Sequence, residues 1–187
     1  MKFSLLFLAA LPATLASQLA YTPPADLVEK AKHGKHHCVL PSEYHVRDFT
    51  ATTNNTGHSL TSYKFTFLNK ATNSSTACEY GPLSKPVVSA NSGGLPRYAC
   101  TNKDVSFVWQ NRHKKLSMIQ KVCPDAKGHS EYEASGTTHI PLSCGLNTCQ
   151  TNSTDHRGIF TSINPIKHGR VIRHNRRGVA WSFDLAN

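Results

Sequence analysis

Tyr63-Lys64-Phe65-Thr66-Phe67 places an aromatic ring at every second position. Because side chains alternate between the two faces of a β-strand, this stretch predicts a strand with one aromatic and one polar face. Val105-Ser106-Phe107-Val108-Trp109 repeats the pattern, and the stretch 116–122 continues it with Leu116, Met118 and Val122 on one side. We expect the aromatic stripe of Tyr63, Phe65, Phe67, Phe107 and Trp109 to form the core of the protein and not a ligand-binding platform, since aromatic residues on strands usually pack inward.

Further strands are predicted on both sides of these stretches. They cover residues 43–49, 159–163 and 139–144, the last as an edge strand because Pro141 cannot donate a backbone hydrogen bond. Turn-rich connections are expected at 54–58, 71–77, 89–96 and 111–115. No stretch has the pattern of an amphipathic helix of three turns. The predicted fold class is therefore all-β, a compact antiparallel β-barrel or sandwich.

The N-terminus has the pattern of a secretory signal peptide. Met1-Lys2 precedes an apolar run from Phe3 to Leu11, and small residues lead to Ala16, after which we place the cut, with 17–20 as an alternative. No second apolar run reaches membrane-spanning length, and the tail shows no lipid-anchor signal, so we expect a secreted, extracellular protein without a membrane anchor. The predicted divisions are a signal peptide at 1–16, a flexible N-terminal extension at 17–37, a disulfide-bonded β domain at 38–165 and a basic C-terminal tail or added hairpin at 166–187.

The chain is strongly basic. Its 187 residues carry a formal charge of +10, which becomes +9 when Lys2 leaves with the signal peptide. The turn at 111–115 and the tail at 167–177 are candidates for binding an acidic polysaccharide, an anionic membrane or nucleic acid. The simpler interpretation is that the charge keeps a secreted protein soluble, and we expect no nucleic-acid partner. Arg176-Arg177 is also a possible dibasic cleavage site.

Export determines how the cysteines and the glycosylation signals are interpreted. An even number of cysteines in a secreted chain predicts a disulfide framework, but six allow 15 pairings. They are Cys38, Cys78, Cys100, Cys123, Cys144 and Cys149. Asn-x-Ser/Thr sequons at Asn54, Asn73 and Asn152 lie in polar clusters that are typical of surface loops.

The sequence contains no catalytic motif of the serine hydrolase, metalloprotease, P-loop or dinucleotide-binding kinds. Glu131 and Glu133 share one face of a possible strand and could act as paired carboxylates, although solvated surface residues are the simpler interpretation. A secreted ribonuclease would need His45 with Glu43, or His139 with Glu131 or Glu133, as acid and base. No spacing supports either arrangement, so no catalytic residue is predicted.

Metal and cofactor sites are not predicted either. His33, His36 and His37 are close in sequence and could bind a divalent cation, but no carboxylate is near them, and a solvated basic arm is the simpler interpretation. A zinc site at Cys144 and Cys149 is disfavoured because their spacing is wide and exported thiols oxidise.

The order of these features resembles a fungal family of secreted major-allergen and elicitor proteins, typified by the principal allergen of Alternaria. The resemblance covers about residues 38–165. It rests on Cys38 followed by Tyr44, Val46 and Phe49, on the two aromatic strands and on the positions of the cysteines. It implies a compact antiparallel β-barrel without an established catalytic site. The similarity also implies that Cys78 pairs with Cys100 and Cys144 with Cys149.

The chain departs from the family at two places. In some members the counterpart of Cys38 forms an intersubunit disulfide, but this chain has an additional Cys123, and a Cys38–Cys123 bond within one chain would leave no free thiol. The oligomeric state, monomer or dimer, therefore stays open. The basic tail also lies outside the family pattern.

These features together predict a secreted, non-enzymatic protein, similar to an effector, elicitor or allergen, that binds an extracellular host protein or a cell-wall polysaccharide. Two alternatives remain. One is a small secreted hydrolase acting on RNA or a glycan, and the other is a carbohydrate-binding module.

Overall fold

The computed structural model describes residues 19–33, 38–54, 59–87 and 95–166. The predicted signal peptide, His36, His37, Arg176, Arg177 and the basic tail from Lys167 onward lie outside the described residues. No helix in the described part of the chain is long and apolar enough to cross a membrane.

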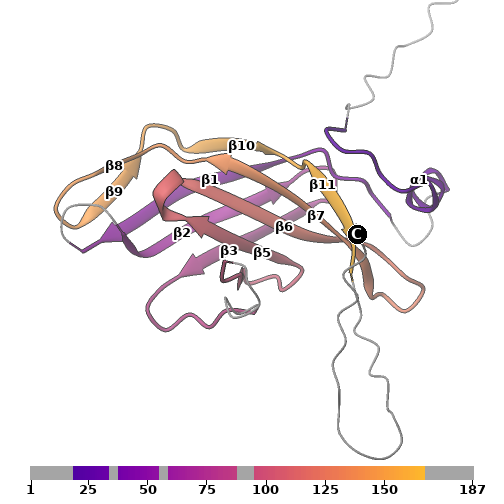
Figure 1. The fold of residues 1–187 in the computed structure, drawn as a ribbon, viewed down its shortest axis with the longest axis horizontal. Helices are drawn as coiled ribbons and strands as arrows, with labels where there is room; N and C mark the ends of the chain where they lie inside the picture. The colour runs from indigo at the N-terminus through magenta and orange to yellow at the C-terminus, as the bar shows by residue number, and fades with distance from the viewer. Residues whose placement is uncertain (1–18, 34–37, 55–58, 88–94, 167–187) are drawn as a thin grey trace, which may run out of the picture.

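Two antiparallel sheets pack against each other (Figure 1), which confirms the all-β prediction in its sandwich form. In the first sheet the strand order is β3 (Ser74–Tyr80), β2 (Leu60–Asn69), β1 (Glu43–Thr53), β9 (Thr148–Thr151) and β8 (Leu142–Cys144), and β10 (Asp155–Ile159) also pairs with β1. In the second sheet the order is β11 (Ser162–Pro165), β7 (Ser130–His139), β6 (Lys115–Pro124), β5 (Val105–Gln110) and β4 (Tyr98–Ala99). A single short α-helix, α1 (Ala25–Lys32), lies at one end of the described structure.

The first strand, β1, is divided by a bulge. One side of β1 pairs with β2, and the register shifts between Arg47 and Thr50. The other side pairs with β10 over Glu43–Arg47 and with β9 at Ala51 and Thr52. Asp48 lies between these two pairings with a φ of 54°, and its N–H donates to the Thr154 carbonyl at 2.9 Å. The bulge therefore lets one long strand pair with two separate partners along the same edge.

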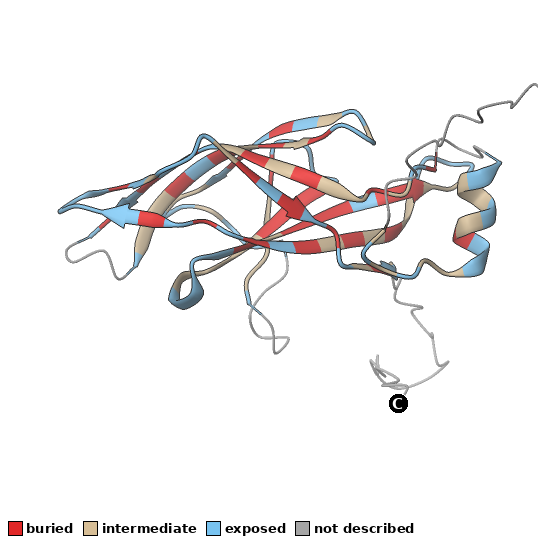
Figure 2. Ribbon diagram, turned by 90° about the horizontal axis from the view of Figure 1, so that it is seen from above, coloured by how far each residue is buried: buried red, intermediate tan, exposed pale blue. Residues whose placement is uncertain are grey.

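The core between the sheets is aromatic. Burial alternates along the strands, as Figure 2 shows, and Tyr63, Phe65 and Phe67 of β2 are 4%, 4% and 0% exposed. The Phe65 ring meets Phe107 of β5 edge-on at 5.3 Å between centroids, so the two sheets contact each other through rings. The core prediction is confirmed for these side chains. Trp109 differs because it is only partly buried at the margin of the core.

The predicted strand at 159–163 is wrong as a single element. β10 ends at Ile159 in the first sheet and β11 begins at Ser162 in the second, so the chain passes from one sheet to the other through Phe160 and Thr161. Phe160 is fully buried, which explains the apolar pattern without a continuous strand. A Cβ on Gly136 of β7 would lie 2.0 Å from the Ile159 carbonyl oxygen, so the chain passes so close to β7 that only glycine fits there.

Two other expectations need correction. The connection predicted at 71–77 is shorter, because β3 already begins at Ser74. The edge strand predicted at 139–144 is split: His139 ends β7 and Leu142 begins β8, with Pro141 between them. β8 does lie at the edge of its sheet, and the 111–115 connection is confirmed as a short 3-10 helix, Asn111–His113.

Three disulfides cross-link the domain. Cys78 pairs with Cys100 and Cys144 with Cys149, as the resemblance implies, and Cys38 pairs with Cys123 within the chain. No cysteine is left free. The Cys38–Cys123 bond joins the segment before β1 to β6 across a sequence separation of 85 residues.

Candidate functional site

The two carboxylates considered for paired catalysis are both in ion pairs. Glu131 and Glu133 lie on one face of β7. Glu131 pairs with Lys30 of α1, and both carboxylate oxygens of Glu133 accept from Nη1 of Arg97, at 2.9 and 3.0 Å. His139 is at the opposite end of β7, roughly 20 Å from Glu133 and roughly 26 Å from Glu131 at ~3.3 Å per residue, so the structure does not bring it to either glutamate. These residues hold elements together, and they form no acid–base pair.

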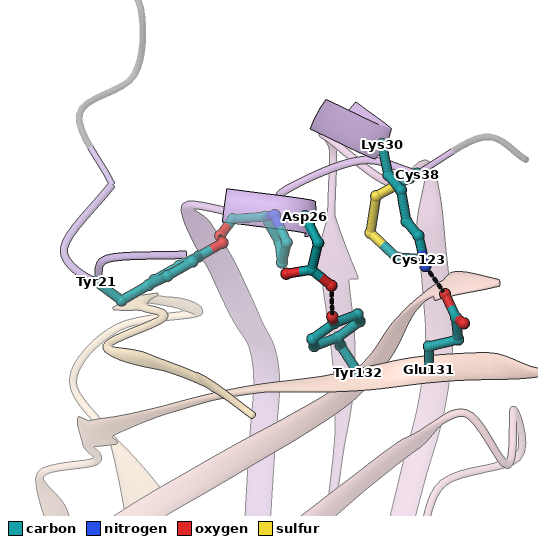
Figure 3. The surroundings of a disulfide bond; sticks show 8 residues. Tyr21, Asp26, Lys30, Cys38, Cys123, Glu131 and Tyr132 are labelled. Atoms are coloured by element: carbon teal, nitrogen blue, oxygen red, sulfur yellow. Dashed lines mark hydrogen bonds and ion pairs between the residues drawn. A yellow bond between two sulfur atoms is a disulfide. The ribbon is translucent and has the colours of Figure 1, made fainter. Parts of the chain in front are cut away.

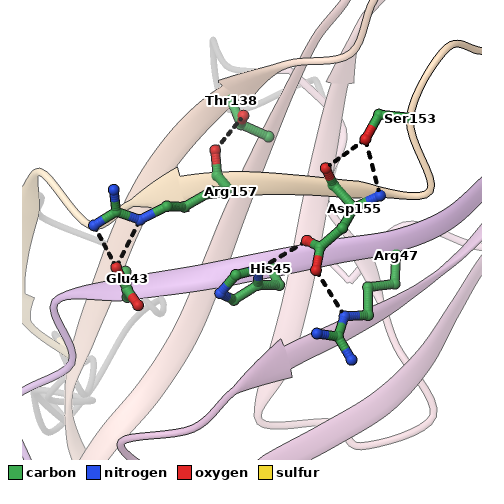
Figure 4. Close-up of polar contacts among 7 residues, drawn as sticks. All are labelled: Glu43, His45, Arg47, Thr138, Ser153, Asp155 and Arg157. Carbon is green, nitrogen blue, oxygen red and sulfur yellow. Dashed lines mark hydrogen bonds and ion pairs between the residues drawn. The ribbon is translucent and has the colours of Figure 1, made fainter.

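In the other candidate pair, His45 and Glu43 each contact a different residue and not each other (Figure 4). Glu43 accepts from Nε of Arg157 at 2.7 Å. His45 Nδ1 lies 2.7 Å from one oxygen of Asp155, and Arg47 Nε donates to the other oxygen at 2.9 Å. Asp155 was not singled out from the sequence because it is 110 residues from His45 and meets it only through the pairing of β1 with β10.

The electrostatics of Asp155 favour a structural role. Partial burial raises its pKa, but the hydrogen bonds from His45 and Arg47 outweigh that effect and leave the pKa below the ordinary value. The Ser153 hydroxyl donates to the backbone carbonyl of Asp155 at 2.8 Å. The described contacts therefore give the imidazole a carboxylate partner but bring no hydroxyl nucleophile to it, and the group ties β10 to β1.

The described residues give no support to the metal sites considered from the sequence. In the described ranges no group of three or more His, Cys, Asp or Glu side chains is arranged to hold a metal ion. His33 lies 3.4 Å from Glu29 on the same helix. The Cys144–Cys149 disulfide also rules out those two residues as a thiolate zinc site.

Helix α1 closes one end of the sandwich (Figure 3), which we call the α1 end. Leu27 is 0% exposed in the core, and the Tyr132 hydroxyl donates to Asp26 at 2.6 Å. Lys30 reaches Glu131, and Tyr21 donates its hydroxyl to the Pro41 carbonyl at 2.8 Å. Residues 19–33 thus differ from the loosely held arm that we expected, because one buried leucine and three polar contacts fix them to the strands.

The pKa shifts at the α1 end follow from these contacts. The hydrogen bond from Tyr132 lowers the pKa of Asp26. The same bond, together with burial, raises the pKa of Tyr132 to about 12. Burial raises the pKa of Tyr21 to about 12. At neutral pH Asp26 is therefore ionised and both phenols are protonated, which is the state in which these hydrogen bonds form.

The opposite end, which we call the turn end, has an aromatic cleft of about 180 Å³ between the sheets. The Tyr80 ring stacks on Tyr63 at 5.0 Å and meets Tyr98 edge-on at 4.8 Å. Trp109 lines the other side, and its indole N–H donates to Oδ1 of Asn111 at 3.2 Å. The remaining lining residues are Ser59, Leu60 and Pro96. Half-buried rings therefore border a small opening that has polar groups at its margin.

A cluster of basic residues follows the cleft directly along the chain. This basic turn consists of Arg112, His113, Lys114 and Lys115, all exposed. Lys114 has a φ of 48°, and its ammonium donates to the Leu142 carbonyl at 2.9 Å. Register places His139 opposite Lys115. The turn end thus combines aromatic surface with positive charge.

Two larger grooves have a different character. One of about 470 Å³ lies near the Cys38–Cys123 bond, and the other of about 490 Å³ lies over the outer face of the first sheet. Hydroxyl, amide and charged side chains such as Thr52, Gln150 and Asp104 contribute much of their lining. Neither groove offers several aromatic faces to a ligand, so we regard the aromatic cleft as the stronger candidate.

The three predicted sequons lie where a glycan can be attached. Asn54, Asn73 and Asn152 are all exposed. Asn73 has a φ of 49° in the connection between β2 and β3. Glycosylation at these positions stays a prediction.

The described residues define a two-sheet antiparallel β protein cross-linked by three disulfides. No known protein-family model matches the chain, and no curated protein sequence is similar to it. Among solved structures, the chain is similar to two crystal structures of the Alternaria alternata major allergen Alt a 1. The first has a TM-score of 0.46 and 17% identity, covering 68% of this chain and 91% of that one. The second has a TM-score of 0.44 and 17% identity, covering 66% and 94%. Alt a 1 is the allergen that typifies the family to which the sequence shows a resemblance. The two structures do not support any conclusion about the function of this chain.

Proposed function

We propose that this chain is an extracellular, non-catalytic protein, similar to an effector, elicitor or allergen, that binds a host or cell-wall component through its turn end. All six cysteines form disulfides, as expected of a protein that matures in an oxidising compartment. The predicted signal peptide supports the same location.

One observation carries the proposal: the aromatic cleft and the basic turn adjoin at the end of the sandwich opposite α1. Tyr80, Tyr98 and Trp109 expose part of their rings there, and Arg112 and Lys115 are exposed beside them. Partly exposed aromatic and arginine side chains are the residue types that contribute most to binding surfaces. Of the acid–base candidates, Glu43, His45, Glu131 and Glu133 are engaged in ion pairs at other places in the fold. His139 lies at the turn end without either glutamate.

Binding to extracellular material tests this proposal. Purified mature protein would be incubated with insoluble plant and fungal cell walls and with immobilised extracellular plant proteins, and the bound fraction measured. We expect retention that Tyr98→Ala weakens. Tyr21→Ala is a matched control because it removes another half-buried tyrosine, at the α1 end, and it should leave retention unchanged.

Two results would contradict the proposal. One is the absence of binding to every such material by a protein whose melt shows that it is folded. The other is turnover of RNA or a glycan that disappears in His45→Ala or Glu133→Gln, because that would establish the hydrolase alternative.

A further inference from the structure

The charges of this molecule are distributed unevenly along its long axis. From Val105 to Gln120 the sequence has three cationic residues, Arg112, Lys114 and Lys115, and no carboxylate, and from Ala134 to Thr154 it has no Asp, Glu, Lys or Arg at all. Both stretches contribute strand ends to the turn end. Glu79 lies outside both stretches, on β3, and its position is directly across from Lys64 of β2.

At the α1 end, in contrast, acidic groups are frequent and engaged. Glu131, Glu133 and Glu43 each pair with a cation, and Asp26 accepts from Tyr132. The positive charge at the turn end has no such compensation. Arg112 and Lys115 are exposed, and no ion pair to either is found among the described residues. A surface of this kind attracts and orients a polyanion.

The aromatic cleft adds a second requirement. Its volume of about 180 Å³ is below the ~300–1,000 Å³ typical of a pocket for a whole small molecule, so it suits one ring of a larger ligand. Three tyrosine rings and the Trp109 ring line it, and they combine apolar faces with phenol hydroxyls and an indole N–H. The apolar face and the hydroxyls of a sugar ring match this combination.

We propose that the turn end binds an acidic polysaccharide of the uronic-acid class. One sugar ring occupies the aromatic cleft, and carboxylates of neighbouring sugars lie against Arg112 and Lys115. This inference rests on the proposed function and names its ligand class.

The test measures the affinity of the full mature protein for polygalacturonate by isothermal titration calorimetry. Arg112→Gln/Lys115→Gln should weaken binding about tenfold and reduce its dependence on salt, because two exposed charge pairs are lost. Lys103→Gln/Lys127→Gln is the matched control. It removes the same charge from exposed sites at the α1 end and should change the affinity less than twofold. Tyr98→Ala should weaken binding as well, without altering the salt dependence.

Other ligands separate this inference from the proposed function. Retention on chitin or glucan that the Arg112→Gln/Lys115→Gln variant leaves intact would overturn the acidic-polysaccharide assignment while the proposed function stands. Equal affinity for RNA, dextran sulfate and polygalacturonate, with no effect of Tyr98→Ala, would also overturn it, since charge alone would then explain binding. Equal weakening by the two double variants would locate the interaction outside the turn end. Failure to bind any wall material or extracellular protein would defeat both proposals.

Discussion

The two ends of this sandwich are built differently. At the α1 end a helix buries Leu27, a disulfide ties the chain before β1 to β6, and carboxylates meet cations or hydroxyls. At the turn end partly exposed rings border a cleft, and Arg112 and Lys115 are exposed. We therefore expect the α1 end to contribute more to stability, and we propose binding at the turn end. Charged groups without an internal ion pair and aromatic rings that are only partly buried remain available to a partner.

The largest difference between the ends should appear when their disulfides are removed. The Cys38–Cys123 bond closes a loop of 85 residues and the Cys144–Cys149 bond one of 5. On the chain-entropy model, Cys38→Ala/Cys123→Ala should lower the free energy of unfolding by about 4–5 kcal/mol and Cys144→Ala/Cys149→Ala by about 2 kcal/mol. Urea denaturation of both variants measures the contrast. Equal losses of unfolding free energy would show that the two disulfides stabilise the protein to the same degree.

The next effect concerns the helix. Leu27→Ala should cost about 3 kcal/mol, because it removes a fully buried side chain and leaves a cavity between α1 and the strands. Lys32→Ala, on the exposed face of the same helix, is the control and should cost under about 0.5 kcal/mol. Thermal or urea unfolding reports both values. If Leu27→Ala matched Lys32→Ala, the helix would contribute nothing to the stability of the α1 end.

Acid should also act on the two ends unequally. The folded protein holds the pKa of Asp26 below its ordinary value through Tyr132, so the unfolded chain takes up this proton more readily. The stability that Asp26 provides is therefore present above about pH 4 and is lost as the pH falls below that value. Amide-exchange protection factors of 25–32 and 130–133 should drop between pH 6 and pH 3 more than those of 108–116.

Asp26→Asn is the control for this pH effect. It removes the titrating group, so the acid-dependent loss of protection in 25–32 should shrink. A loss that is uniform over the whole domain, or unchanged in Asp26→Asn, would remove acid sensitivity as a difference between the ends.

The smallest expected effect is that of the exposed pair on β1 and β10. Arg157→Gln breaks its contact with Glu43 but should cost only about 0.2–1 kcal/mol, because the Arg157 side chain is 64% exposed and water screens the interaction. Arg112→Gln at the turn end should cost still less, since no acidic partner is lost. Parallel melts of the two variants compare them. A loss of unfolding free energy above about 2 kcal/mol for Arg157→Gln would mean that the Arg157–Glu43 pair contributes strongly to holding β10 against β1.

The strands with large inward residues were predictable from the sequence. β2 and β5 alternate rings with small or polar residues, so their period of two is visible. The strands that the sequence pattern does not predict clearly, such as β10 and β7, have small or polar residues at their inward positions. The inward positions of β10 are His156 and Gly158, and those of β7 include Ala134 and Gly136, which give little hydrophobic signal. β3 begins in a Ser/Thr-rich stretch that reads as a turn for the same reason.

The candidate site was less predictable than the fold. The basic turn is continuous in sequence, so its charge is visible there. The cleft is made by residues from strands that are distant in sequence, and the residues around Tyr80 and Tyr98 do not predict that these two rings line a cleft. The His45–Asp155 contact likewise depends on a strand pairing across 110 residues. Two of the three disulfides, Cys78–Cys100 and Cys144–Cys149, were implied by the family resemblance, because spacing alone allowed many alternatives. The Cys38–Cys123 bond departs from the family and was considered only as a possibility.

The two partners along the outer edge of β1 come from residues 148–159, near the end of the described chain. β1 is the first strand to be synthesised, and about half of the chain must follow it before that edge can be covered. Pairings this distant fold slowly, so the completed sheet forms only after synthesis of the whole domain. The growing chain therefore exposes an unpaired strand edge until residues 148–159 are made, and we expect its yield to depend on chaperones that shield such edges.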